Sequence, residues 1–237
     1  MKVSALIFGY NDYASQIAKN VQHKYSEITI FKLKDSVDEK LEKLEQFNVE
    51  KFDLSDEWKE FSQTHNIQES VAFCVLEDDA ENIFLTISLR AEFKDLNIIA
   101  MSKNKESANK LSMAGANKVI PLVQTTASII SDMLDKPIVT EILHNILYEK
   151  SDLKVAQIEI KEHECFEGKY PSDIEWSRSH GIIVLSVTHE DGSSEFIYSS
   201  KAKHHAIKKG DVFVVVGYDK DIKDFEELIG AKRCQSE

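Results

Sequence analysis

The sequence predicts an α/β protein with a parallel-sheet lobe, a helical crossover and a small C-terminal α+β lobe. Nearly all-apolar runs such as 3–8 and 71–76 alternate with segments in which apolar residues recur at helical spacing. Two apolar helices follow residue 126, and beyond residue 150 apolar and polar residues alternate, as at 155–160. Repeated β-α units of this length form a parallel sheet with right-handed crossovers, so the first lobe is predicted to be of the Rossmann type.

The first lobe, residues 1–126, is predicted to hold six strands, at 3–8, 28–33, 49–52, 71–76, 96–101 and 118–121. Helices are predicted between them, at about 14–21, 41–47, 56–63, 79–93 and 107–114. Asn11 or Asp12 can cap the first of these helices, and Ser55 can cap the third, by accepting hydrogen bonds from their first turns. Gly115 is predicted to end the last of them.

The crossover, residues 127–150, is predicted to contain helices at 127–134 and 138–148. Ile138, Ile142 and Ile146 belong to a wide apolar face, which must be covered by the first lobe or by a second copy of the chain. The last lobe, residues 151–237, is predicted to have four strands and a closing helix, at 155–160, 182–187, 195–198, 212–216 and 222–229. An Asp191-Gly192 pair is typical of a hairpin turn.

The composition excludes several classes of partner. The net charge of −12 and pI near 5.2 argue against nucleic acid and anionic membranes, since either would need a basic surface. Three cysteines without CxxC spacing (Cys74, Cys165 and Cys234) favour a reducing cytosol over a disulfide framework. We expect no signal peptide and no membrane span in the chain, although it could be one piece of a longer membrane protein.

The turn after the first strand carries part of a dinucleotide-binding fingerprint. Gly9 occupies the first glycine position, Asn11 the second and Ala14 the third, and Asp12 adds a charge that repels phosphate. Lys32 stands where a ribose-binding acid would end the second strand. The turn either joins a strand to a helix or binds a nucleotide such as ADP, ATP or NAD. The candidate nucleotide-binding residues are Gly9, Tyr10, Asn11, Asp12, Tyr13, Ala14 and Lys32.

Carboxylates gather at the edge of the sheet where its strands end. Asp53 follows the third strand, and Glu77, Asp78, Asp79 and Glu81 follow the fourth. They could hold a divalent cation, or they could simply favour the starts of helices; Asp53, Glu77 and Asp79 are candidate ligand contacts.

The second lobe offers further metal donors, at 163–165, 189–191 and 204–205, but none has the spacing of a zinc site. Cys74 lies in an apolar strand and is expected to be an inert thiol. The chain contains no nucleophile elbow, P-loop or HExxH motif, so we predict that it is not an enzyme.

Two sets of residues resemble the RCK (regulator of potassium conductance) family, the cytosolic ligand-sensing modules of prokaryotic potassium channels and Trk/Ktr-type uptake systems. In the first lobe they are Gly9, Ala14, 52–53, 79–84, 89–90, 98–100 and 114–121. In the second lobe they are 166–169 and 207–217.

The resemblance implies a Rossmann lobe, a dimerising crossover and a C-terminal ligand-sensing lobe. It also implies homodimers that assemble into an octameric ring and gate a potassium-conducting partner at the inner face of the membrane. The run from Met101 to Lys103 lacks the acids of calcium-gated members, so no calcium site is assigned there. The rival interpretations are an NAD(P)-dependent oxidoreductase and a ligand-free scaffold.

Overall fold

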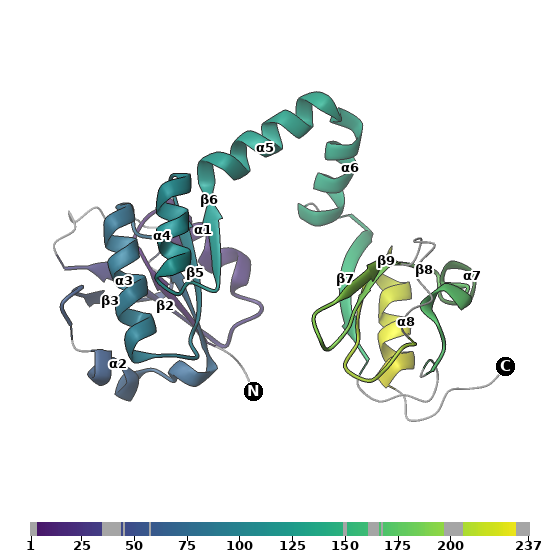
Figure 1. Ribbon diagram of the computed structural model, residues 1–237, viewed down its shortest axis with the longest axis horizontal. Helices are drawn as coiled ribbons and strands as arrows, with labels where there is room; N and C mark the ends of the chain where they lie inside the picture. The colour runs from purple at the N-terminus through teal and green to yellow at the C-terminus, as the bar shows by residue number, and fades with distance from the viewer. Residues whose placement is uncertain are drawn as a thin grey trace. The chain divides into compact units, whose positions relative to one another are not determined.

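The computed structural model describes residues 4–34, 44, 46–56, 58–148, 151–160, 166, 168–196 and 206–230. The chain divides into two compact units, Met1–Ser131 and Asp132–Glu237. Figure 1 follows it from purple at the N-terminus to yellow in the last helix. The predicted helix at 41–47 falls largely outside the described residues, as do the second half of the predicted strand at 195–198 and the donors at 163–165 and 204–205.

The first unit is built on a six-stranded parallel sheet with strand order β3-β2-β1-β4-β5-β6. This order confirms the predicted Rossmann-type lobe. It reverses at β1, which pairs with β2 on one side and β4 on the other, so the carboxyl ends of β1 and β4 flank the crevice where such sheets bind ligands. The strands are β1 Ser4–Phe8, β2 Glu27–Leu33, β3 Asn48–Phe52, β4 Ser70–Cys74, β5 Asn97–Ser102 and β6 Lys118–Pro121.

Helices cover both faces of this sheet, which explains why its central strands β1 and β4 are nearly all apolar. Ala5 and Ile7 of β1 pack with Ala14 and Ala18 of α1 on one face. The alternate residues, Leu6 and Phe8, belong to the core on the other face, where α3 and α4 lie side by side (Figure 1). The helices are α1 Asp12–Val21, α2 Trp58–Thr64, α3 Asp79–Glu92 and α4 Lys105–Met113, with a 3-10 turn at Ile67–Glu69.

Two helices, α5 Leu122–Asp135 and α6 Pro137–Tyr148, follow the parallel sheet. The first begins five residues before the helix predicted at 127–134, and the second lies where a helix is predicted at 138–148. The chain turns at Lys136, and Pro137 opens α6, a position at which its missing N–H costs no hydrogen bond. Their apolar side chains are largely exposed: Ile138, for example, is 71% accessible. The exposed apolar residues of the pair include Ile129, Ile130, Met133, Leu134, Ile138, Val139, Ile142, Leu143 and Leu147.

The second unit is the small α+β lobe that the sequence predicts. Its sheet is antiparallel, with order β7-β10-β8-β9, and α8 packs on one face through Ile222 and Phe225. The strands are β7 Leu153–Glu159, β8 Ile182–Thr188, β9 Ser194–Phe196 and β10 Val212–Tyr218; the helices are α7 Trp176–His180 and α8 Asp219–Gly230, with a 3-10 turn at Pro171–Asp173. Of the helices described in either unit, none has the length and apolarity needed to cross a bilayer.

Candidate functional site

The turn between β1 and α1 lies against the end of β4, and this contact requires glycine at position 9. Gly9 has a φ of +147°, a conformation that L side chains rarely adopt. A Cβ built there would stand 2.7 Å from the carbonyl oxygen of Val75. The backbone N–H of Gly9 donates to the carbonyl of Phe31, which ties the turn to β2 as well. The first glycine of the fingerprint therefore keeps its steric purpose in this chain.

Asn11 fastens the same turn in a way that a second glycine cannot. Its Oδ1 accepts from the backbone N–H of Ala14 at 3.0 Å and caps α1. Its Nδ2 donates to the carbonyl oxygen of Val75 at 2.7 Å. The side chain is only 8% exposed, so both of its polar atoms are committed to the protein. One N–H of the first helical turn is thus already occupied, which leaves fewer donors for a phosphate.

The neighbouring residues of the turn differ in exposure. Ala14 is fully buried against the sheet, as the third fingerprint position requires. Asp12 and Tyr13 are exposed in the first turn of α1. The carboxylate of Asp12 lies near the positive end of the helix dipole, where a ligand phosphate would otherwise be favoured.

Lys32 and Tyr10 meet beside this turn. Lys32 lies one residue before the end of β2, next to Phe31, and its Nζ lies 4.7 Å from the centroid of the Tyr10 ring. The lysine is only 7% exposed. A buried ammonium loses hydration, and the electron-rich face of the tyrosine ring offsets part of that loss. The structure therefore brings together two of the residues predicted for the site, from elements 22 positions apart in the sequence.

Asp53 lies at the end of β3 and closes a local turn. Its Oδ1 accepts from the backbone N–H of Ser55 at 2.9 Å and from the Ser55 hydroxyl at 2.7 Å. These hydrogen bonds, the backbone one foremost, lower the pKa of Asp53 from its ordinary value. Its neighbour Asp56 pairs with Lys34 at 2.9 Å. One oxygen of the Asp53 carboxylate is therefore engaged within the turn.

The acids after β4 stabilise the start of α3. Asp78 caps the helix by accepting from the N–H groups of Ala80 and Glu81. Asp79 accepts from the backbone of Lys103 and the amide of Asn104, which links α3 to the loop after β5. Glu77 is exposed. These bonds support the helix-start interpretation, and no group of three metal-ligating side chains occurs in the described part of the chain.

Sequence reasoning missed Asn82, the residue that fixes the ends of two strands. It is fully buried on α3, and its amide bonds both the N–H and the carbonyl of Leu76 and also the carbonyl of Met101. The available signal was a polar residue among the apolar positions of the helix, beside Ile83 and Leu85. Asn82 completes the backbone hydrogen bonds that β4 and β5 leave open at the site edge.

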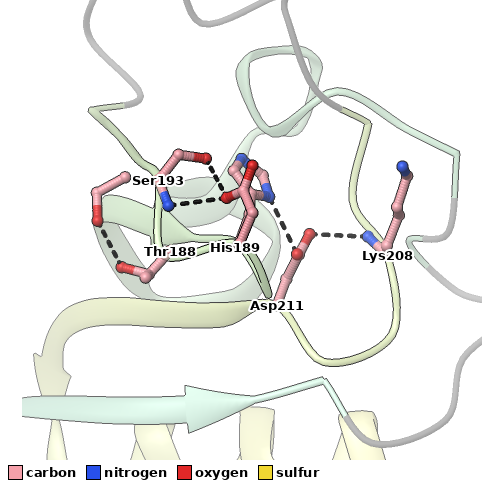
Figure 2. Close-up of polar contacts among 7 residues, drawn as sticks. Thr188, His189, Ser193, Lys208 and Asp211 are labelled. Carbon is pink, nitrogen blue, oxygen red and sulfur yellow. Dashed lines mark hydrogen bonds and ion pairs between the residues drawn. The ribbon is translucent and has the colours of Figure 1, made fainter.

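In the second unit His189 forms a buried pair with Asp211 (Figure 2). The His189 Nδ1 lies 3.0 Å from Asp211 Oδ1, and Asp211 Oδ2 accepts from the backbone N–H of Lys208 at 2.8 Å. The sequence places His189 among possible metal donors, but this ring nitrogen joins the end of β8 to the start of β10. The pair therefore links two neighbouring strands of this lobe.

A cavity of about 370 Å³ also lies in this unit, between the end of α7 and α8. Burial lowers the pKa of the His180 imidazole, which is one of its walls. The phenyl ring of Phe225 and two carboxylates provide the rest of its chemical character. The lining residues are Ser179, His180, Gly181, Asp221, Asp224, Phe225 and Leu228.

Comparison with known proteins gives matches over both units. Residues 5–122 match the TrkA-N domain family. "Probable potassium channel protein 2" of Methanocaldococcus jannaschii is 25% identical over 164 residues, 67% of this chain and 46% of that protein. "Potassium channel protein 1" of the same organism is 22% identical over 155 residues, 65% of this chain and 45% of that protein. The chain thus spans about half the length of the curated relatives that it matches.

Among solved structures, the human SLO3 gating ring superposes with a TM-score of 0.67 at 11% identity, covering 93% of this chain and 45% of that one. At this identity the likeness concerns the fold. It extends across the parallel-sheet lobe, the crossover and the small lobe.

Proposed function

We propose, from the premise that this chain is an RCK-type domain with a TrkA-N domain at residues 5–122, that it is the cytosolic regulatory part of a potassium channel or uptake system. The observation that carries the proposal is that two curated relatives are named as potassium channel proteins, one of them as a probable one. The chain would act at the inner face of the membrane, through a pore segment or a partner subunit. We divide it into a nucleotide-binding lobe (1–126), a dimerising crossover (127–150) and a ligand-sensing lobe (151–237).

In this function the chain is a sensor and carries out no chemical turnover. A ligand shifts a pore between open and closed states only when it binds the two shapes with different affinity. Coupling of this kind is typically about 1–3 kcal/mol, or roughly 5- to 150-fold in affinity. The cavity beside His180 supports the C-terminal lobe as a second place where a ligand could act.

The crossover helices support assembly as a homodimer. Ile138, Ile142 and Leu147 of α6 are each more than half exposed. Burying the apolar side chains of α6 would contribute on the order of 5 kcal/mol per protomer, at about 2 kcal/mol for each fully buried residue. That gain is comparable with the cost of bringing two chains together, so the neighbouring apolar residues of α5 would add the surplus. Dimers would then associate into the octameric ring.

Light scattering coupled to size-exclusion chromatography tests the assembly. The wild-type chain is expected to be a dimer or larger, and Ile138→Glu/Ile142→Glu is expected to shift it towards monomer. Phe84→Glu is the matched control, because Phe84 is an exposed apolar residue on α3, outside the crossover. A strictly monomeric wild-type chain at high concentration, with and without nucleotides, would contradict the proposal.

The turn at Gly9 is the proposed nucleotide site, with ADP, ATP or NAD as ligand classes. Gly9, Tyr10, Asn11, Asp12, Tyr13, Ala14 and Lys32 would form its wall, and Asp53, Glu77 and Asp79 its rim, where a divalent cation could accompany the phosphates. Its place at the reversal of strand order supports the assignment.

A thermal-shift panel of ATP, ADP, NAD, NADH, calcium and zinc tests this site. A ligand at 100 times its dissociation constant should stabilise the chain by about 2.7 kcal/mol. Stabilisation by none of them would favour a ligand-free scaffold. Nicotinamide binding together with turnover of a substrate would favour an oxidoreductase.

A further inference from the structure

The charges around the turn at Gly9 are reversed relative to a dinucleotide site of this architecture. In such sites the positive end of the first helix holds the pyrophosphate, and an acid at the end of the second strand holds the ribose 2′-hydroxyl. In this chain Asp12 opens α1, and Lys32 lies one residue before the end of β2. Negative charge therefore lies where phosphate is expected, and positive charge where the ribose is expected.

The position of Lys32 is set by the sheet. Phe8 and Phe31 are paired in register, and the N–H of Gly9 donates to the Phe31 carbonyl at 2.9 Å, so the next residue of β2 lies beside the turn. The contact with the Tyr10 ring shows that the ammonium points to this turn. Because the side chain is more than nine-tenths buried, its attraction to an anion is screened far less than that of a surface lysine.

The N-terminus of α1 attracts a phosphate less than Lys32 does. Asn11 Oδ1 already accepts from the N–H of Ala14, and the Asp12 carboxylate repels an anion at the same place. A nucleotide lying across the turn would therefore gain most from a negative group near Lys32, at the level of its ribose.

We propose, resting on the nucleotide site proposed above, that Lys32 selects nucleotides with a phosphate group on the adenosine ribose over those with free ribose hydroxyls. The preferred class is adenosine phosphorylated at the 2′ position, as in adenosine 2′-monophosphate and NADP⁺. Lys32 is then the specificity-determining residue of the site, in the place where an acid would select NAD⁺.

Titration calorimetry of the whole chain with matched pairs of ligands tests the selection. The pairs are NADP⁺ against NAD⁺, and adenosine 2′-monophosphate against adenosine. The member that carries the ribose 2′-phosphate is expected to bind at least tenfold more tightly than its partner, equivalent to about 1.4 kcal/mol. Lys32→Gln should abolish the preference, and Lys32→Asp should invert it towards NAD⁺. Lys34→Gln is the matched control, since Lys34 follows the same strand but is exposed and paired with Asp56.

The outcomes separate the two proposals. Equal affinity within each pair, or a preference that survives in Lys32→Gln, overturns the selection by Lys32 and leaves the nucleotide site standing. Binding of no nucleotide overturns both. Circular dichroism melting of each variant checks that a lost preference comes from the lost charge and not from unfolding. Rising salt should weaken the member with the additional ribose phosphate more than its partner in each pair.

Discussion

Asn11→Ala should destabilise the first unit, because it removes two hydrogen bonds from a buried turn. The lost bonds are the cap on the N–H of Ala14, at 3.0 Å, and the bond to the carbonyl of Val75, at 2.7 Å. An asparagine cap is worth about 1 kcal/mol relative to alanine. The bond to Val75 contributes about 1 kcal/mol and leaves a carbonyl without its partner, which adds up to about 1 kcal/mol more.

The expected loss is therefore about 2–3 kcal/mol in the free energy of unfolding. For a unit of this size that corresponds to a fall of roughly 8–12 °C in the melting temperature. Asn11→Ser divides the loss into its parts, since serine is as good a cap but is too short to donate to Val75. It should cost about 1–2 kcal/mol.

Urea unfolding followed by circular dichroism gives both values, with the slope against denaturant used to check that the unfolded state is unchanged. Asn104→Ala is a useful comparison, because Asn104 caps α4 and its amide bonds an exposed carboxylate. Its loss should be smaller, near 1 kcal/mol. A change below about 0.5 kcal/mol in Asn11→Ala would refute the idea that Asn11 fastens the turn to β4.

Three further predictions concern single residues. Gly9→Ala should cost about 3 kcal/mol, from backbone strain and the contact with β4, whereas Gly192→Ala, with open space around it, should cost about 1 kcal/mol by the same urea assay. Burial raises the pKa of the Cys74 thiol to about 12, so in a variant whose other cysteines are serine a disulfide reagent should react only as fast as the protein unfolds; rapid labelling would contradict this. Burial lowers the pKa of His180 from its ordinary value of 6.5, so its contribution to stability is complete above about pH 6.5 and is lost as the pH falls below that value and through the lower pKa of the folded state; His180→Asn should flatten this part of the pH–stability curve.

The central strands of the first unit, such as β1 and β4, follow from the sequence because both of their faces are buried, whereas the edge strands β3 and β6 are partly exposed along their length. The predicted fourth strand nevertheless ends two residues late: β4 stops at Cys74, although Val75 and Leu76 are also buried. Apolar character reports burial, whereas a strand requires pairing of backbone groups. Past Cys74 the N–H of Val75 still donates to the carbonyl of Phe8, but the remaining groups are bonded by side chains: the Val75 carbonyl by Asn11, 64 positions away, and Leu76 by Asn82, six positions away. A run of apolar residues does not reveal such side-chain partners.

The sequence pointed to the residues of the candidate site, but it did not reveal the hydrogen bonds that these residues form. The fingerprint located Gly9, and strand position located Lys32. The acids illustrate the limit: Asp78 and Asp79 suit a cation and a helix start equally well in sequence, and only their bonds to N–H and amide groups distinguish the two. The order of strands in the parallel sheet could not be predicted from the sequence either. Short β-α units fix the handedness of each crossover, but they do not fix the side on which the next strand pairs.

The pairing of β1 with β4 has a consequence for the order of folding. All other neighbours in the parallel sheet are consecutive along the chain, whereas this seam joins residues such as Asn11 and Val75, which are 64 positions apart. Closing the longest loop has the largest entropy cost, so we expect the two halves of the sheet to form before they join. Contacts at the seam are then absent from the transition state, and strengthening them slows unfolding while leaving the folding rate almost unchanged. A ligand lying across this turn would therefore lengthen the lifetime of the folded lobe by slowing its unfolding.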